Sequence, residues 1–303
     1  MPFFSFDKNK GKPIGIINGG EHDKKIINVC ENKNNDKCCD YCNSDCGIKK
    51  KLCCNNCENL EGGCDSCDRD DFSRGLAMIF SNELKKIKSG EIDSIEIKDG
   101  KMEPIPKCDE NQVDHIFIAG PSGAGKSTWA SMYIKLWKKI FPNRKFFLIS
   151  DVLKDEILDK LKPKRIILDE RMYEDPIPID AFKNSLVLFD DIDTIKDENI
   201  RDSVKKLRDE ILEKGRHNNT NVLSISHNPT NNKATKASLL ESSSVVLFPG
   251  GGDDFHMRNV LKNYCGIDPK KINDILNLNS RWIQVSKKYP KYILHEKGAF
   301  LPK

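Results

Sequence analysis

The sequence has little that could enter a membrane, and few arginines. No run approaches the eighteen apolar residues that a membrane span needs, and residues 1–12 lack the apolar core of a signal peptide. We therefore expect an intracellular, soluble protein with no membrane partner. Lysine outnumbers arginine about four to one. An arginine that occurs despite this preference for lysine is a candidate for phosphate binding, because its planar guanidinium can bind phosphate at two points.

The chain also lacks a strong charge imbalance. It has 303 residues, a net charge of +4, 38% apolar residues and 32% charged residues. This length suits one large domain or two ordinary ones. The small net charge neither requires nor excludes a nucleic-acid partner, since a local basic groove can exist within a balanced total.

The first part of the chain, residues 1–110, is expected to be a β-rich region with a cysteine-rich insertion at 30–71. Short apolar runs around Asn-Gly-Gly predict strands near the start. A helix is expected at 76–87, and the pattern at 95–105 predicts a hairpin around Lys-Asp-Gly. Whether the first and last strands of this region pair into one small sheet is left open.

From residue 111 the pattern changes to apolar strands alternating with helices. This alternation predicts an α/β fold with a mainly parallel central sheet and helices on both faces. We assign 111–250 to the core of that domain. Residues 251–303 contain two short helical stretches and a terminal hairpin, and are expected to complete it.

A glycine-rich loop follows the apolar run Ile116–Ile118 and precedes a helical pattern that ends before Pro142. Its sequence fits G-x-x-x-x-G-K-[ST], the Walker A loop of P-loop NTPases. Glycines let the backbone N–H groups surround phosphate oxygens, Lys126 is expected to reach the β- and γ-phosphates of ATP, and Ser127 to ligate Mg²⁺. The predicted nucleotide-binding residues are Gly120, Pro121, Ser122, Gly123, Ala124, Gly125, Lys126, Ser127 and Thr128.

Two acidic pairs compete for the Walker B role, which is to hold Mg²⁺ and activate water. Asp190 and Asp191 end the buried-strand run 186–189, and we assign Asp190 to the metal and Asp191 to the attacking water. Asp169 and Glu170 end the shorter run 166–168, which is typical of an additional or edge strand. We favour the first pair.

A Gly-Arg-His turn precedes a further strand at 222–226, which leads to His227. A polar residue there, His227 or Ser226, could sense the γ-phosphate, and the alternative is a satisfied polar group at a strand end. Arg216 could be an arginine finger that reaches a neighbouring subunit's nucleotide. The alternative is an ordinary solvated arginine.

The segments GPSGAGKST, LVLFDD and LEKGRHNNTNVLSISHNPT, in that order, resemble the viral branch of the FtsK–HerA ATPases, the poxvirus-type virion packaging ATPases of large DNA viruses. The resemblance covers about residues 111–250. It implies a sheet in which the acidic strand is two places from the phosphate-loop strand, with the polar strand between them. It also implies a homo-oligomeric ring that moves double-stranded DNA, in the host cytoplasm or the virion. The sequence departs from that family at His227, where glutamine is usual.

Ten of the twelve cysteines lie between Cys30 and Cys67. Three C-x-x-C pairs suit tetrahedral zinc–thiolate sites, with disulfides and an unliganded loop as alternatives. The six residues of these pairs are Cys39, Cys42, Cys54, Cys57, Cys64 and Cys67.

Three functions are compatible with these features. The leading one is an ATP-hydrolysing DNA motor, for which Lys233 and Lys236 are guessed DNA contacts. The second is a nucleotide or small-molecule kinase, although no arginine-rich lid is visible. The third is a nucleotide-dependent assembly switch. An ABC-type ATPase is not expected, because no segment resembles L-S-G-G-Q.

Overall fold

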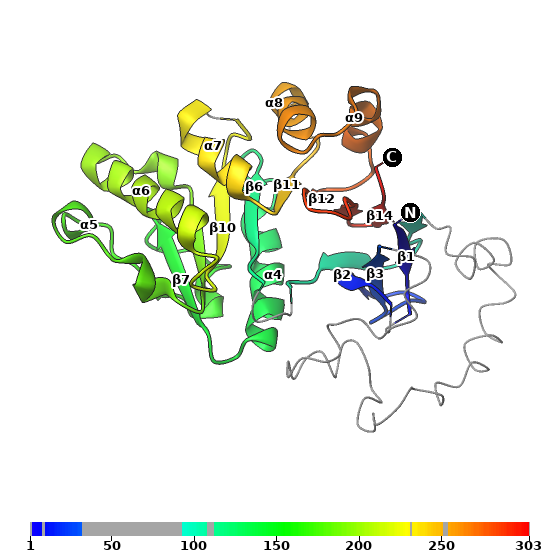
Figure 1. Ribbon diagram of the computed structural model, residues 1–303, viewed down its shortest axis with the longest axis horizontal. Helices are drawn as coiled ribbons and strands as arrows, with labels where there is room; N and C mark the ends of the chain where they lie inside the picture. The colour runs from blue at the N-terminus through cyan, green and yellow to red at the C-terminus, as the bar shows by residue number, and fades with distance from the viewer. Residues whose placement is uncertain are drawn as a thin grey trace, which may run out of the picture.

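The computed structural model describes residues 2–7, 10–31, 93–107, 112–230, 232–250 and 254–302. Their strands form a small antiparallel sheet and a larger mixed sheet (Figure 1). The small sheet has the order β1-β3-β2-β5, with strands Phe3–Ser5 (β1), Lys12–Asn18 (β2), Ile26–Cys30 (β3) and Lys101–Pro104 (β5). The pairing of β2 with β5 joins the first and last strands of the N-terminal region, the arrangement that the sequence left open.

The larger sheet has the order β4-β14-β13-β12-β11-β6-β10-β9-β7-β8. Pairs from β11 to β8 are parallel, and those from β4 to β11 are antiparallel. Its strands are Ser94–Glu96 (β4), His115–Ala119 (β6), Lys145–Ser150 (β7), Lys164–Arg165 (β8), Ser185–Asp190 (β9), Asn221–Ser226 (β10), Ser244–Leu247 (β11), Ile283–Ser286 (β12), Ile293–His295 (β13) and Gly298–Phe300 (β14).

The helices cover both faces of this sheet, as predicted (Figure 1). Alternate residues of β6 point to opposite sides: Ile116 and Ile118 join the apolar cluster that contains α4, whereas Phe117 and Ala119 join the cluster under α7, α8 and α9. The helices are Lys126–Ile140 (α4), Arg171–Glu174 (α5), Glu198–Lys214 (α6), Asn232–Glu241 (α7), Asp254–Asn259 (α8, continued by a π-helical turn, Val260–Tyr264) and Pro269–Leu276 (α9).

The small sheet packs on α4. Apolar residues of β2 and β3, such as Ile17 and Ile27, share one buried cluster with Trp129, Tyr133 and Trp137 of that helix. Helix α4 therefore lies between two sheets, and its first turn is held at the edge where the parallel strands end. In the part of the chain that the structure describes, no helix combines the length and hydrophobicity needed to cross a bilayer.

Two predictions about strands were wrong. The hairpin expected at 95–105 does not form, because β4 pairs with β14 while β5 pairs with β2 in the other sheet. The strand expected at 166–168 is shorter and earlier: β8 is only Lys164–Arg165, at the edge beside β7. The terminal hairpin was correct, since β12 and β13 pair antiparallel, and β14 extends it. The helix expected at 76–87 lies outside the described residues.

Candidate nucleotide site

The phosphate loop has the strand–turn–helix context that its sequence predicts. Strand β6 leads directly into it, and α4 begins at Lys126. Gly123 and Gly125 have φ values of 75° and 107°, in the left-handed region that favours glycine. A Cβ at Gly120 would lie 3.0 Å from the side chain of Phe248. The loop's shape and close packing therefore both need glycine.

Lys126 is buried, and its ammonium is folded back onto the loop. Nζ donates to the carbonyl oxygens of Gly120 at 2.9 Å and Pro121 at 3.1 Å, and to Nδ1 of His227 at 3.1 Å. Burial lowers the pKa of Lys126, and Asp191 and Asp190 partly oppose this. The ammonium of Lys126 is thus held beside the loop by uncharged acceptors, and a phosphate group can replace them.

The partners of His227 define its tautomer. An ammonium has only donors, so Nδ1 of His227 must accept from Lys126 and carry no proton. The proton is then on Nε2, which donates to Oδ2 of Asp191 at 2.9 Å. Lys126, His227 and Asp191 form a chain of contacts across α4, the end of β10 and the end of β9.

Asp190 and Asp191 lie where β9 ends, two strands from β6 with β10 between them. The strand order implied by the family resemblance is therefore confirmed. The register aligns the strand ends: Ser226 pairs with Ala119, and Ile225 pairs with Asp190. The N–H of Gly120 donates to the carbonyl of Ser226 at 3.3 Å, which ties the loop to the polar strand.

The acidic pair carries charge that the protein neutralises only in part, because Lys126 is the cation that offsets both carboxylates. Burial, Asp191 and Asp155 raise the pKa of Asp190 to about 6, and its side-chain contact is with Ser150 Oγ, at 3.3 Å. Oδ1 of Asp191 is buried and has no hydrogen-bond partner among the described residues. Asp191 also has φ 48°, a strained value for a residue other than glycine. Two carboxylates that are only partly compensated fit a divalent cation, because the ion removes the charge that burial penalises.

The rival pair lies elsewhere. Asp169 and Glu170 follow the edge strand β8, and Asp169 forms an ion pair with Arg171 at 2.5 Å. The side chain of Arg171 is 70% exposed. An exposed, paired carboxylate beyond β7 has neither the position nor the free charge of the pair on β9.

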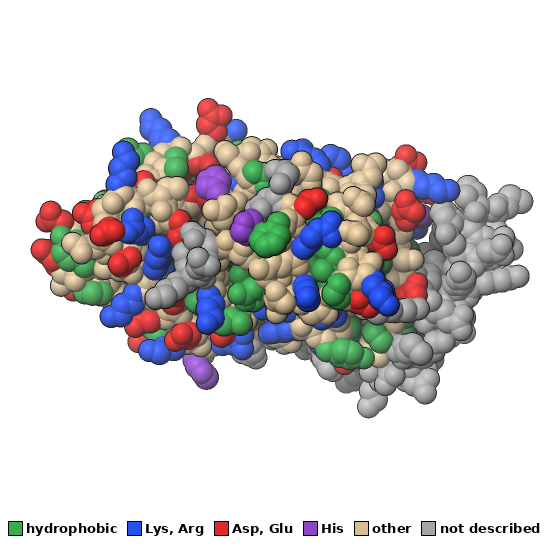
Figure 2. Space-filling model, turned by 90° about the horizontal axis from the view of Figure 1, so that it is seen from above, with side chains coloured by type: hydrophobic (Ala, Val, Ile, Leu, Met, Phe, Trp, Pro, Cys, Tyr) green, Lys and Arg blue, Asp and Glu red, His purple; other side chains and the backbone are tan. Residues whose placement is uncertain are grey.

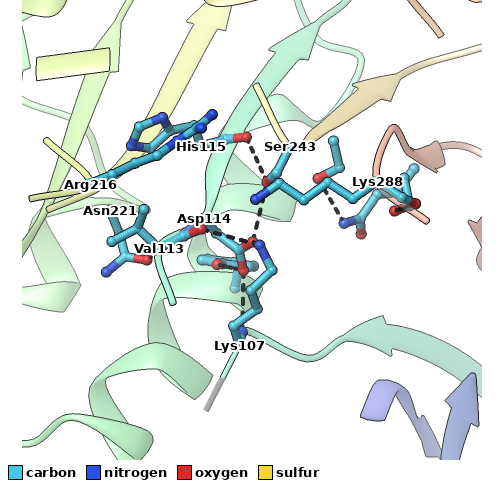
Figure 3. A network of polar contacts seen from close by, with 12 residues as sticks. Lys107, Val113, Asp114, His115, Arg216, Asn221, Ser243 and Lys288 are labelled. Carbon is cyan, nitrogen blue, oxygen red and sulfur yellow. Dashed lines mark hydrogen bonds and ion pairs between the residues drawn. The ribbon is translucent and has the colours of Figure 1, made fainter. Parts of the chain in front are cut away.

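Arg216 lies at the opposite end of the strands from the phosphate loop. It lies near His115, where β6 starts (Figure 3), and contacts Glu241 with an ion-pair distance of 3.7 Å. The phosphate loop follows the other end of β6, so Arg216 cannot act on its own subunit's nucleotide. The arginine-finger role, which concerns a neighbouring subunit, stays a prediction.

Sequence reasoning missed two residues that touch the loop. Phe248, directly after β11, packs on Gly120, and the guanidinium of Arg281 reaches Gly125, where a Cβ would lie 3.5 Å from Nη2 of Arg281. The scarcity of arginine in the sequence could have pointed to Arg281 as a phosphate-binding residue, but it does not distinguish Arg281 from the other arginines.

The remaining candidates are less informative. The six cysteines of the predicted zinc pairs lie outside the described residues. Cys30 and Cys265 are buried free thiols, and burial raises the pKa of Cys265 to about 12, as expected for a packed cysteine. Lys236 is exposed on α7. In the described residues, no cluster of three or more His, Cys, Asp or Glu side chains suits a metal ion.

Comparisons with known proteins give one close relative and several distant structures. No family model matches the chain. The genome packaging NTPase B204 of Sulfolobus turreted icosahedral virus 2 has a TM-score of 0.42 at 12% identity, over 61% of this chain and 97% of that one. The pCW3 conjugation coupling protein TcpA has a TM-score of 0.45 at 14% identity, over 70% and 66%. Likenesses this distant do not decide function.

The sequence relative is much closer. The chain is 41% identical over 205 residues to the uncharacterized protein V3 of Sputnik virophage, and the match covers 67% of this chain and 82% of that protein. This chain therefore belongs to the same protein family as protein V3 of Sputnik virophage.

Proposed function

We propose that this protein is a Mg²⁺-dependent ATPase that works as a DNA-translocating or packaging motor. The observation that carries the ATPase part is the convergence of three side chains on the phosphate loop. Lys126, His227 and Asp191 come from three separate elements and contact one another in series. A glycine turn held only for structural reasons would not need a buried Asp190 and a neighbouring Asp191 whose charge is only partly offset beside it.

In this proposal the loop's N–H groups and Lys126 bind the triphosphate, and Lys126 exchanges its carbonyl partners for the β- and γ-phosphates. Ser127 and Asp190 are the residues that would hold Mg²⁺, which supplies charge neutralisation on the phosphates. The burial and raised pKa of Asp190 support this assignment, because Lys126 offsets only part of the cost of ionising this buried carboxyl beside Asp191.

Asp191 is the proposed base. His227 donates to Oδ2 and fixes the carboxylate's orientation, while Oδ1 has no partner in the described chain and can accept the proton of the attacking water. The water oxygen bonds to the γ-phosphorus, and the bond to the bridging oxygen of ADP breaks. His227 thus positions the base and also contacts Lys126, so it can register whether the lysine is bound to phosphate.

The DNA-motor part rests on the order of the three motifs and on the strand order that the structure shares with the resemblance. The contacts to DNA are not assigned. In the view from above, Lys and Arg side chains alternate with Asp and Glu and do not gather into one stripe (Figure 2). In a ring of subunits, Arg216 would contact the nucleotide that the adjacent subunit binds.

The test is ATP hydrolysis by the purified full-length protein with and without double-stranded DNA, together with its mass in solution. Stimulation by DNA and a mass of several subunits support the motor. Transfer of phosphate to a nucleoside monophosphate would identify a kinase instead. Slow turnover that DNA does not change would favour the assembly switch.

A further inference from the structure

Arg281 lies at the phosphate loop of its own subunit, although it follows Lys126 by 155 positions in the sequence. Its neighbour Trp282 is buried and packs edge-on against Trp129 in the first turn of α4, with ring centroids 6.2 Å apart. The N–H of Arg281 donates to Oε2 of Glu296 at 2.9 Å, and Ser280 Oγ donates to the carbonyl of Trp282 at 2.6 Å. The backbone is therefore clamped on both sides of Arg281, and its guanidinium extends over Gly125.

The position of Arg281 identifies the part of the nucleotide that it can reach. Strand β10 and the acidic strand β9 lie on one side of β6, and β11 and β12 lie on the other. Asp190, Asp191 and His227 define the γ-phosphate end on the first side. Arg281 precedes β12 and is on the second side. If the γ-phosphate of a bound nucleotide faces His227, the α-phosphate of that nucleotide lies on the side of the loop where Arg281 is.

The charge of Arg281 is available for a ligand. The residues that the structure describes place no carboxylate within ion-pair distance of its guanidinium. Its planar fork suits phosphate oxygens better than a lysine ammonium does.

Building on the proposed function, we propose that Arg281 binds the α-phosphate end of the nucleotide in its own subunit. It contributes equally to the binding of ATP and ADP, because both carry that phosphate. It is not an arginine finger, which would act on the γ-phosphate and on turnover.

The test compares ATP and ADP affinity, KM and kcat for the full-length wild type, Arg281→Ala and Arg281→Lys. Loss of a charge-assisted contact should weaken both nucleotides about tenfold and raise KM similarly, with kcat within about twofold. Arg281→Lys keeps the charge without the fork, so it should fall between the other two. Lys145→Ala, which removes an exposed charge at the far end of β7, is the control and should bind like the wild type.

Wild-type affinity in Arg281→Ala overturns the inference. So does a fall in kcat with unchanged ADP affinity, because that pattern belongs to a γ-phosphate contact. If the wild type binds neither nucleotide, the proposed function itself fails, and the two failures are thereby distinguished. Thermal melting of each variant shows whether lost binding reflects lost folding.

A second, independent observation concerns a pocket of about 360 Å³ at the other end of the strands. It lies between the small sheet and the ends of β6, β11 and β12, and its lining includes Lys107, Arg216 and Lys288 (Figure 3). Lys12 also lines the pocket. These cations come from four separate segments of the chain.

The carboxylates nearby do not balance these cations. Asp114 is buried and pairs with Lys107 at 2.5 Å, while Tyr133 donates to it at 2.8 Å. Lys12 pairs with Glu31 on the surface, and Arg216 has its 3.7 Å contact with Glu241. Lys288 forms no ion pair with the described residues. Burial, together with Lys107, Arg216 and Lys12, lowers the pKa of Lys288, whereas Asp114 opposes this.

We infer that this pocket binds a phosphate group through Lys288, which lines it and has no ion pair with the described residues. The phosphate could belong to a free compound or to the DNA backbone, since both present the same oxyanion. A protein with Lys126→Ala separates this pocket from the phosphate loop, and inorganic pyrophosphate and a short DNA duplex serve as probes.

In that background, adding Lys288→Ala should weaken pyrophosphate binding at least fivefold, and adding Lys145→Ala should not. If binding of the duplex also weakens, and if its salt dependence shows that about one fewer counterion is released, the phosphate is that of DNA. If only pyrophosphate binding weakens, the ligand is a free phosphate compound. Binding of both probes that is unaffected by Lys288→Ala overturns the inference.

Discussion

Replacing Asp190 by asparagine should make the metal-free protein more stable while removing its proposed metal ligand. The pKa of Asp190 is raised from 3.8 to about 6, first by burial and then by Asp191. A group with a raised folded-state pKa holds its proton more tightly when folded. Stability therefore falls as pH rises from about 4 to about 6, and the full penalty is present above pH 6.

The size of the penalty follows from this shift. A difference of about two pKa units corresponds to about 3 kcal/mol. Asparagine has nearly the same shape and can still accept from Ser150. We expect Asp190→Asn to raise the free energy of unfolding by about 1–3 kcal/mol at pH 8.

The assay is urea unfolding at pH 8 and at pH 4, without Mg²⁺ and then with Mg²⁺ and ATP. The gain should disappear at pH 4, and ligand should stabilise the wild type but not the variant. Asp169→Asn is the control, because that exposed carboxylate pairs with Arg171 and should give no gain. An Asp190→Asn variant that is less stable at pH 8 would show that the carboxylate is already compensated in the folded protein.

Three further variants test the site residues. Lys126→Ala should reduce turnover at least about a hundredfold because it removes the cation at the phosphates, and near-normal hydrolysis would refute the site. Asp191→Asn should bind ATP normally but hydrolyse it about 10²–10⁴-fold more slowly, measured by single turnover. Unchanged turnover would show that Asp191 is not the base. His227→Ala should lower kcat about tenfold or more, because it removes the contacts to both Asp191 and Lys126, and the affinity for ATP should change little. His227→Gln should recover part of the lost kcat.

The centre of the fold was predictable because its signals are local. The phosphate loop is one continuous segment with a strand before it and a helix after it. The preference for Asp190 over Asp169 came from the longer apolar run before it, and the structure gives the physical reason: β9 is buried in the sheet, while β8 is a two-residue edge strand.

The errors concern distant pairing. Lys-Asp-Gly does form a bend, with Gly100 at φ 100°, but its flanking strands pair with segments far away in the chain. The N–H groups of Ile97 and Met102 donate to the carbonyls of Lys297 and Glu296. The local sequence, which predicts a hairpin, carries no signal for these distant hydrogen bonds. Arg281 was missed for the same reason, since only the packing of Trp282 on Trp129 brings it to the loop.

Hydrolysis of ATP by the purified full-length protein, measured with Mg²⁺ and with EDTA beside Lys126→Ala, tests the central claim most directly. We expect phosphate release that requires Mg²⁺ and is lost in the variant. Wild-type release no faster than that of Lys126→Ala, or release that EDTA does not change, would contradict a catalytic site built from this loop and the acidic end of β9.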